Sequence, residues 1–158
     1  MKNISSFEID HTKLLPGLYV SRKDYIGSEV VTTFDLRVCR PNVDSAMSTD
    51  EIHTIEHIAA TYLRNEPKWS DKVVYFGPMG CRSGFYLILA GSHASSDILS
   101  LVCDCFNYIS NFTGDIPGAT AEGCGNYLDM NLPLAKSRAK NYFEILSNAT
   151  SEQLVYPN

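Results

Sequence analysis

The feature that most constrains the fold is a ten-residue segment in which apolar and polar residues alternate from its fourth residue onward. The segment is VVTTFDLRVC, residues 30–39. Its large apolar side chains occupy every second position: Phe34, Leu36 and Val38. The positions between them are held by Thr33, Asp35, Arg37 and Cys39. Because successive side chains of a strand point to opposite faces, this pattern predicts a β-strand with one face on a core.

The remaining periodic segments predict both strands and helices. Two apolar runs of strand length, residues 73–77 and 84–91, are joined by the turn PMGCRS. Apolar residues recur at helical spacing over residues 98–112 and, after Pro133, over residues 134–146. The sequence contains no repeat, low-complexity tract or linker. We therefore predict one α+β domain spanning residues 1–158, in which a mainly antiparallel sheet is covered by helices.

Composition and charge argue against several classes of partner. The 158 residues are 44% hydrophobic and carry a net charge of −5, with no run of Lys or Arg. Neither nucleic acid nor an anionic membrane is an expected partner. No stretch of about 18 consecutive apolar residues occurs, and the first residues, MKNISSFEIDH, lack an export signal, so we expect a cytoplasmic protein. The five cysteines are an odd number, which favours reduced thiols over a disulfide framework.

The motif HTIEH lies on a predicted helix over residues 49–64, which begins with a capping-box pattern of Ser48 and Glu51. At 100° per residue, His53, Glu56 and His57 share one stripe of that helix. The pattern H-x-x-E-H is an inverted form of a metallopeptidase signature, and two histidines one turn apart can bind one metal ion. The alternative is a pair of solvated histidines, which a bare H-x-x-x-H would favour. The glutamate shifts that balance only moderately.

A metal site needs at least one further ligand, and Cys124 in AEGCGNY is the best candidate. Glycines on both sides permit close backbone approach, and a third protein ligand leaves the fourth position open for water or substrate. The alternative is an ordinary loop thiol. The remaining cysteines outside turns, Cys39, Cys103 and Cys105, are predicted to be structural.

Cys81 occupies the glycine-flanked turn GPMGCRSG between two predicted strands. The neighbouring Arg82 is a positive charge that can lower the pKa of an accessible thiol. The pattern indicates a thiol that transfers protons or acts as a nucleophile. The alternative is a turn cysteine without a chemical role.

Several separated motifs together resemble one family. They are SFEIDHT, FDLRVCRPN, IHTIEH, PMGCRSGFY, IPGA and CG, and they run from about Ser6 to Gly125. Their order and spacing are similar to those of the S-ribosylhomocysteine lyases, the LuxS family. The combination is highly specific, although each motif alone is not.

The resemblance implies an α+β metalloenzyme fold and a carbon–sulfur lyase. Such an enzyme cleaves S-ribosylhomocysteine to homocysteine and a dihydroxy-pentanedione, the autoinducer-2 precursor in quorum sensing. It implies one divalent metal ion per subunit, with Fe²⁺ expected and Zn²⁺ or Co²⁺ able to substitute. It also implies a homodimer with its sites at the subunit interface, where the N-terminal segment of one subunit reaches into the other's site.

The resemblance also assigns roles to individual residues. The metal ligands correspond to His53, His57 and Cys124, and the acid/base pair to Glu56 and Cys81. Substrate-contacting positions correspond to Ser6, His11 and Arg37. We hypothesise that Cys81 acts as a thiolate base and Glu56 as the second acid/base, because moving a carbonyl along the sugar takes protons from carbon.

One segment departs from the family pattern. Tyr75, Phe76 and Gly77 stand where the family usually has D-I-S, so an acidic substrate contact is missing and the amino-acid end of the substrate is expected to be held differently. Two other classes of protein remain as alternatives: a metallopeptidase-like hydrolase, and an interaction domain stabilised by a structural metal. A hydrolase has no evident need for Cys81, and no fourth ligand that would close a structural site is obvious.

Overall fold

A four-stranded antiparallel sheet and three helices make up the computed structural model, which describes residues 7–157. The strands are β1 (Gly17–Ile26), β2 (Glu29–Arg37), β3 (Val73–Pro78) and β4 (Gly84–Ala90), in the order β1-β2-β4-β3. The helices are α1 (Thr49–Asn65), α2 (Ser95–Ser110) and α3 (Leu132–Ser147). Two short 3₁₀ turns, η2 (Ser70–Lys72) and η3 (Ser151–Gln153), complete the elements.

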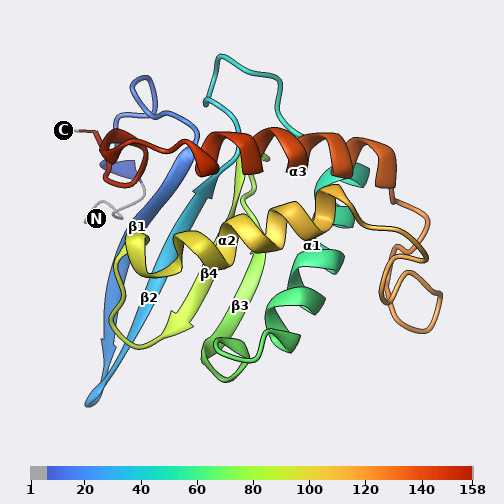
Figure 1. The fold of residues 1–158 in the computed structure, drawn as a ribbon, viewed down its shortest axis with the longest axis horizontal. Coiled ribbons are helices and arrows are strands. Elements are labelled where there is room, and N and C mark those ends of the chain that lie inside the picture. Colours follow the sequence, from blue (N-terminus) through green and yellow to red (C-terminus); the bar gives the residue numbers. More distant parts are fainter. Residues whose placement is uncertain (1–6, 158) are drawn as a thin grey trace.

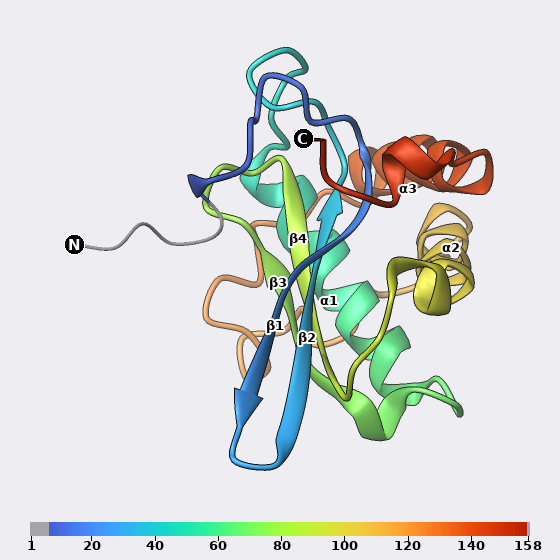
Figure 2. The same cartoon turned by 90° about the vertical axis from the view of Figure 1, so that its left-hand side faces the viewer.

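The three helices cover one face of the sheet, as the two perpendicular views show (Figures 1 and 2). Phe34 and Leu36 of β2 point into this layer, and in the register they stand opposite Leu87 and Phe85 of β4. The apolar stripes of α2 and α3 supply the other side, including Phe106 and Tyr142, whose rings meet edge to face at 4.7 Å. The predicted α+β fold, a mainly antiparallel sheet covered by helices, is confirmed.

The sequence prediction for residues 30–39 was correct in its alternation but wrong in its end point. Strand β2 ends at Arg37, and Cys39 belongs to the apolar core instead of the opposite face. The polar face of β2 is also buried, since Asp35 is 1% exposed and Arg37 2%. The second face is covered because Tyr156, near the C-terminal end, lies against it.

Strand β1 has no counterpart in the sequence prediction. Its register to β2 shifts between Val20 and Arg22, so the alternation of side chains is broken within the strand. Its second half is largely exposed, which removes the apolar signal of a buried face. The strand forms a hairpin with β2 through the two-residue turn Gly27-Ser28, in which Gly27 has φ of 64°, and the sequence analysis missed this turn.

Helix α1 begins at Thr49 with the predicted capping box, and it ends at Asn65, one residue beyond the predicted end. The Glu51 carboxylate accepts a hydrogen bond from the Ser48 backbone N–H at 3.1 Å. The same carboxylate, with a side chain 6% exposed, binds Nε of Arg138 at 2.6 Å and so links α1 to α3. This fixes the helix that carries HTIEH. Among residues 7–157, no helix has the length and apolar character needed to cross a membrane.

Candidate metal centre and reactive thiol

The structure brings His53, His57 and Cys124 together although the cysteine is far from the histidines in sequence. One potential ligand atom from each lies within 4.8 Å of the others. The two imidazole rings, one helical turn apart on α1, have centroids 4.7 Å apart and meet edge to face. The Cys124 Sγ lies 3.4 Å from Nε2 of His53. This residue set, with two imidazoles and one thiolate, suits a divalent metal with an open fourth position.

Backbone carbonyls fix which nitrogen of each histidine faces the cluster. Nδ1 of His53 lies 3.0 Å from the carbonyl oxygen of Asp129, and Nδ1 of His57 lies 2.7 Å from that of Pro117. Each Nδ1 therefore donates its proton to a carbonyl, which leaves the Nε2 lone pair for a metal ion. Such outer hydrogen bonds are the usual support of metal-binding histidines. The residues present thus fit a bound metal ion.

The loop between α2 and α3 positions Cys124, the third potential ligand. Gly118 has φ of 69°, a conformation that favours glycine. A side chain at Gly123 would place its Cβ 2.8 Å from the Gly118 carbonyl oxygen, so the loop can close this tightly only with glycine there. The Cys124 N–H donates to the carbonyl of Thr120 at 2.9 Å, and the Asn126 N–H donates to the Cys124 sulfur at 3.4 Å. Together these bonds fix the position of the Cys124 sulfur beside the histidines.

Glu56 lines the same cavity, of about 540 Å³, as the three potential ligands. Within the part of the chain that the structure describes, its half-buried carboxylate has no hydrogen-bond or ion-pair partner. A carboxylate without such a partner, beside three potential metal ligands, is available to exchange protons with a bound substrate.

Cys81 lies in a tight turn between β3 and β4. Arg82, the next residue, has φ of 56°, and its N–H donates to the Met79 carbonyl at 2.9 Å. Non-glycine residues with positive φ are uncommon and often mark functional turns. The turn leaves the Cys81 thiol exposed.

The neighbours of Cys81 favour its thiolate form. Burial raises the pKa of the thiol, but hydrogen bonds from the side chain and backbone of Ser83 and the charge of Arg37 together bring the pKa below its usual value of 9.0. The Ser83 hydroxyl lies 3.0 Å from the sulfur, and Nη1 of Arg37 lies 3.8 Å from it. The sequence argument credited Arg82, whereas Arg37 is the arginine that contacts the sulfur.

Arg37 itself is buried and fully engaged within the chain. Its Nε and Nη2 donate to Asp35 at 3.1 and 2.6 Å, and Nη1 donates to the Ser83 hydroxyl. With the arginine side chain 3% exposed, this is a buried ion pair, and removing one partner of such a pair typically costs about 3–5 kcal/mol. The predicted substrate contact of Arg37 stays a prediction.

His11 lies in the same cavity as Cys81, which has a volume of about 280 Å³. Its Nδ1 is 2.8 Å from the Ile9 carbonyl oxygen. Ser6, the other predicted substrate contact at this end, lies outside the described residues. The two cavities share no lining residue, so within one chain the metal cluster with Glu56 and the thiol with His11 line separate cavities.

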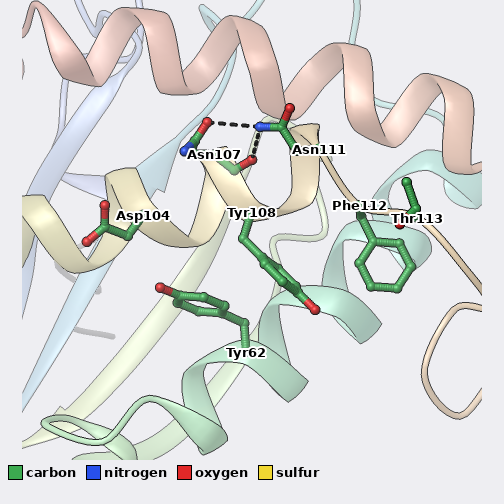
Figure 3. Close-up of a pocket in the computed structure, with 7 residues that line it drawn as sticks. All are labelled: Tyr62, Asp104, Asn107, Tyr108, Asn111, Phe112 and Thr113. Carbon is green, nitrogen blue, oxygen red and sulfur yellow. Dashed lines mark hydrogen bonds between the residues drawn. The ribbon is translucent and has the colours of Figure 1, made fainter.

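A further cavity, of about 500 Å³, lies between α1 and α2 and contains none of the predicted site residues. Figure 3 shows its aromatic wall, where Tyr62 and Tyr108 stack in a tilted pair with centroids 5.1 Å apart. The Asn111 amide donates to the side-chain and backbone oxygens of Asn107 at 3.1 and 2.9 Å, so the polar groups opposite are bonded to each other (Figure 3).

Comparison with known proteins supplies the family. The model of the family described as S-Ribosylhomocysteinase (LuxS) matches residues 4–153. The chain belongs to the LuxS family. An S-ribosylhomocysteine lyase of Clostridium beijerinckii is 57% identical to it over 100% of both chains. Those of Finegoldia magna and Phocaeicola vulgatus are 55% and 52% identical, covering 99% of this chain and 99% and 98% of theirs. The predicted family is confirmed.

Two residues of the segment 75–77 of this LuxS chain lie close together in the structure. Tyr75 and Gly77 lie on the same face of β3, and the hydroxyl end of the Tyr75 ring occupies the space that a side chain at Gly77 would need. A side chain at position 77 would therefore require the half-exposed Tyr75 ring to turn away. The predicted loss of an acidic substrate contact in this segment stays a prediction.

Ser83 is a residue of this LuxS chain that the sequence analysis missed, and its contribution can be measured. Ser83→Ala removes the hydroxyl that stabilises the Cys81 thiolate, so the pKa of the thiol is expected to rise. Alkylation of Cys81 by iodoacetamide at pH 7 should slow roughly tenfold, the value of about one charge-assisted hydrogen bond. The rate should recover at higher pH, where both proteins carry the thiolate. Equal rates at pH 7 would show that the hydroxyl does not stabilise the thiolate.

Proposed function

We propose that this chain cleaves S-ribosylhomocysteine to homocysteine and a dihydroxy-pentanedione by carbonyl migration followed by β-elimination of the thioether. Its family membership confirms the predicted enzyme class, a carbon–sulfur lyase. The observation that carries the detailed proposal is the group of His53, His57 and Cys124 with the unpartnered Glu56 beside it. A divalent ion, which we propose to be Fe²⁺, would supply Lewis-acid stabilisation of negative charge on the sugar oxygens.

The side chains of this protein account for the proton transfers that such a reaction needs. Each shift of the carbonyl removes a proton from one sugar carbon and delivers a proton to its neighbour. Cys81, whose pKa is lowered, is proposed to take protons as the thiolate, and Glu56 to act as the second acid/base. In the last step a base removes the proton adjacent to the carbonyl, the carbon–sulfur bond breaks, and homocysteine leaves as a thiolate.

A homodimer is proposed because the two halves of this chemistry line different cavities of one chain. One cavity holds the metal group and Glu56, and the other holds His11 and Cys81. If the first cavity of one subunit faces the second cavity of its partner, each dimer has two complete sites at its interface. Closed twofold symmetry makes both sites equivalent.

Hybrid dimers test this arrangement. His57→Ala removes a proposed metal ligand and Cys81→Ala removes the thiol, so each variant alone should be inactive. In a hybrid dimer that contains one subunit of each variant, one site combines the altered metal group with the altered thiol. The other site combines the intact metal group with the intact thiol and has no defect. Random mixing of subunits by unfolding and refolding should therefore restore roughly a quarter of the native activity.

Two controls make the result decisive. Each variant refolded alone should stay inactive. The second control mixes native protein with a double variant that carries both changes. Every hybrid of these two has one defect in each site, so only the native dimers should be active. Activity that stays at background after mixing, although mass spectrometry of the intact complexes detects hybrids, would contradict sites shared between subunits.

The cellular setting is also a proposal. We propose a cytoplasmic enzyme whose five-carbon product serves as the autoinducer-2 precursor in quorum sensing and whose other product returns to homocysteine recycling. The thiols at Cys81 and Cys124, both free in the structure, require reducing conditions to work as base and ligand. The experiment that tests the proposed activity is the release of homocysteine from S-ribosylhomocysteine by reduced, metal-loaded protein.

A further inference from the structure

A row of buried and half-buried polar side chains crosses the face of the sheet opposite the helices. Tyr19 of β1, Asp35 of β2 and Tyr86 of β4 are paired in register across three neighbouring strands. Asp35 is 1% exposed and accepts both hydrogen bonds of the Arg37 fork. Burying a carboxylate costs free energy that hydrogen-bond donors offset, so the donors around Asp35 decide where it holds the arginine.

The C-terminal end of the chain supplies one of these donors. The Tyr156 hydroxyl donates to Oδ2 of Asp35 at 2.8 Å, the same oxygen that binds Nη2 of Arg37. The Tyr156 ring stacks on Tyr19, with centroids 4.8 Å apart and planes inclined by 13°. Gln153 also ties this end of the chain down, since its side-chain amide donates to the Pro16 carbonyl at 3.1 Å. The C-terminal end lies beside the start of β1 in Figure 1.

A continuous set of contacts thus runs from the C-terminal end to the thiol. The hydroxyl of Tyr156 holds Asp35, Asp35 holds two arms of the Arg37 guanidinium, and the third arm reaches Ser83 and Cys81. Because the guanidinium is planar and rigid, fixing Nε and Nη2 on the carboxylate also fixes the direction of Nη1. We infer that Tyr156 is a positioning residue for Cys81, which acts by holding Asp35 so that Arg37 points at the sulfur.

The sign of the effect follows from the charges around the carboxylate and the thiol. Without the tyrosine donor, Asp35 is left with fewer hydrogen bonds and draws the guanidinium more strongly to itself, away from the sulfur. The thiolate then loses part of its nearest positive charge, and the pKa of Cys81 rises. The other charged or titratable groups in the cavity of Cys81 are His11, Arg40 and Asp44, and those facing Asp35 are Tyr19, Tyr86 and Tyr142. Tyr156→Phe keeps the ring that stacks on Tyr19, so it changes none of these groups.

The test is the pH dependence of Cys81 alkylation in the metal-loaded protein, followed by mass spectrometry of the peptide that contains Cys81. Tyr156→Phe keeps the ring and its stack on Tyr19 and removes only the hydroxyl. Alkylation at pH 7 should slow by about threefold and recover at high pH. Tyr156→Leu, which also removes the stack, should slow it at least as much.

Tyr142→Phe is the matched control. The Tyr142 hydroxyl is also buried and donates to a backbone carbonyl, that of Gly17, at 2.7 Å, but it makes no hydrogen bond to Asp35 or Arg37. Its loss should lower the melting temperature and leave the alkylation profile unchanged. A profile that is unmoved in Tyr156→Phe, or moved equally in Tyr142→Phe, would overturn the inference.

The inference rests on the proposed role of Cys81, but its failure is distinguishable from a failure of that role. Alkylation reports the state of the thiol without any turnover. If Cys81→Ser retained full activity while Tyr156→Phe shifted the alkylation profile, the positioning of the thiol would stand and its role in the reaction would fall.

Discussion

Replacing Cys81 by serine is expected to lower kcat/KM for S-ribosylhomocysteine by about 10²–10⁴-fold, the usual contribution of a positioned acid/base. A serine hydroxyl is a far weaker acid than the Cys81 thiol, whose pKa is lowered by its neighbours, although its size and place in the turn are nearly the same. The metal content should not change, because Cys81 does not line the cavity of His53, His57 and Cys124. Steady-state kinetics and elemental analysis of the same sample check both statements.

Cys103→Ser is the matched control for this change. Cys103 is also a free cysteine but lies half-buried on α2, and it lines none of the cavities of the proposed site. Its replacement should leave kcat/KM near the native value. Native turnover by Cys81→Ser, with metal bound, would remove Cys81 from the reaction and leave Glu56 as the sole proton carrier.

Replacing Cys124 by alanine is expected to abolish activity by a different route, through loss of the metal. Two histidines remain, and a divalent ion held by only two protein ligands binds far more weakly than one held by three. Since even loss of an outer hydrogen bond typically costs about 10–100-fold in metal affinity, loss of a ligand should cost at least about 100-fold. Metal content after dialysis, measured beside the fold by circular dichroism, is the direct readout.

The comparison of the two cysteine variants separates binding from chemistry. Cys124→Ala should lose metal and activity together, and excess Fe²⁺ or Co²⁺ should restore part of both. Cys81→Ser should keep its metal and gain nothing from excess metal. Full retention of metal by Cys124→Ala at native affinity would contradict the proposed ligand set.

The sequence predicted those parts of the fold that have a local periodic signal. Helix α1, with its capping pattern and HTIEH stripe, and the hairpin of β3 and β4 around Cys81 were both predicted, with bounds within one or two residues. Strand β1 was not, because a bulge breaks its alternation and half of its length faces solvent. The one local signal for it is the hairpin turn at Gly27, which leads directly into β2 and which the sequence analysis missed.

The candidate site divides in the same way. Residues of distinctive chemistry in distinctive patterns, such as His53 and His57 or Cys124 between glycines, are recognisable in the sequence. Ser83 and Tyr156 are not, since a serine in a turn and a tyrosine near the C-terminal end are common. Their proposed importance comes from a hydroxyl placed 3.0 Å from the Cys81 sulfur and another placed 2.8 Å from Asp35. The burial of Arg37 between Asp35 and Ser83 was also not predictable, because it depends on contacts that form only in the folded chain.

The most direct test of the proposed reaction is the identity of both products. Reduced, Fe²⁺-loaded protein is incubated with S-ribosylhomocysteine, homocysteine is measured with a thiol reagent, and the dicarbonyl product is trapped with an aromatic diamine. Carbonyl migration with β-elimination predicts one trapped dihydroxy-pentanedione for each homocysteine released, and no cleavage of peptides by the same sample. Release of homocysteine together with free ribose would indicate hydrolysis of the thioether, and that result, or no thiol above background, would contradict the account.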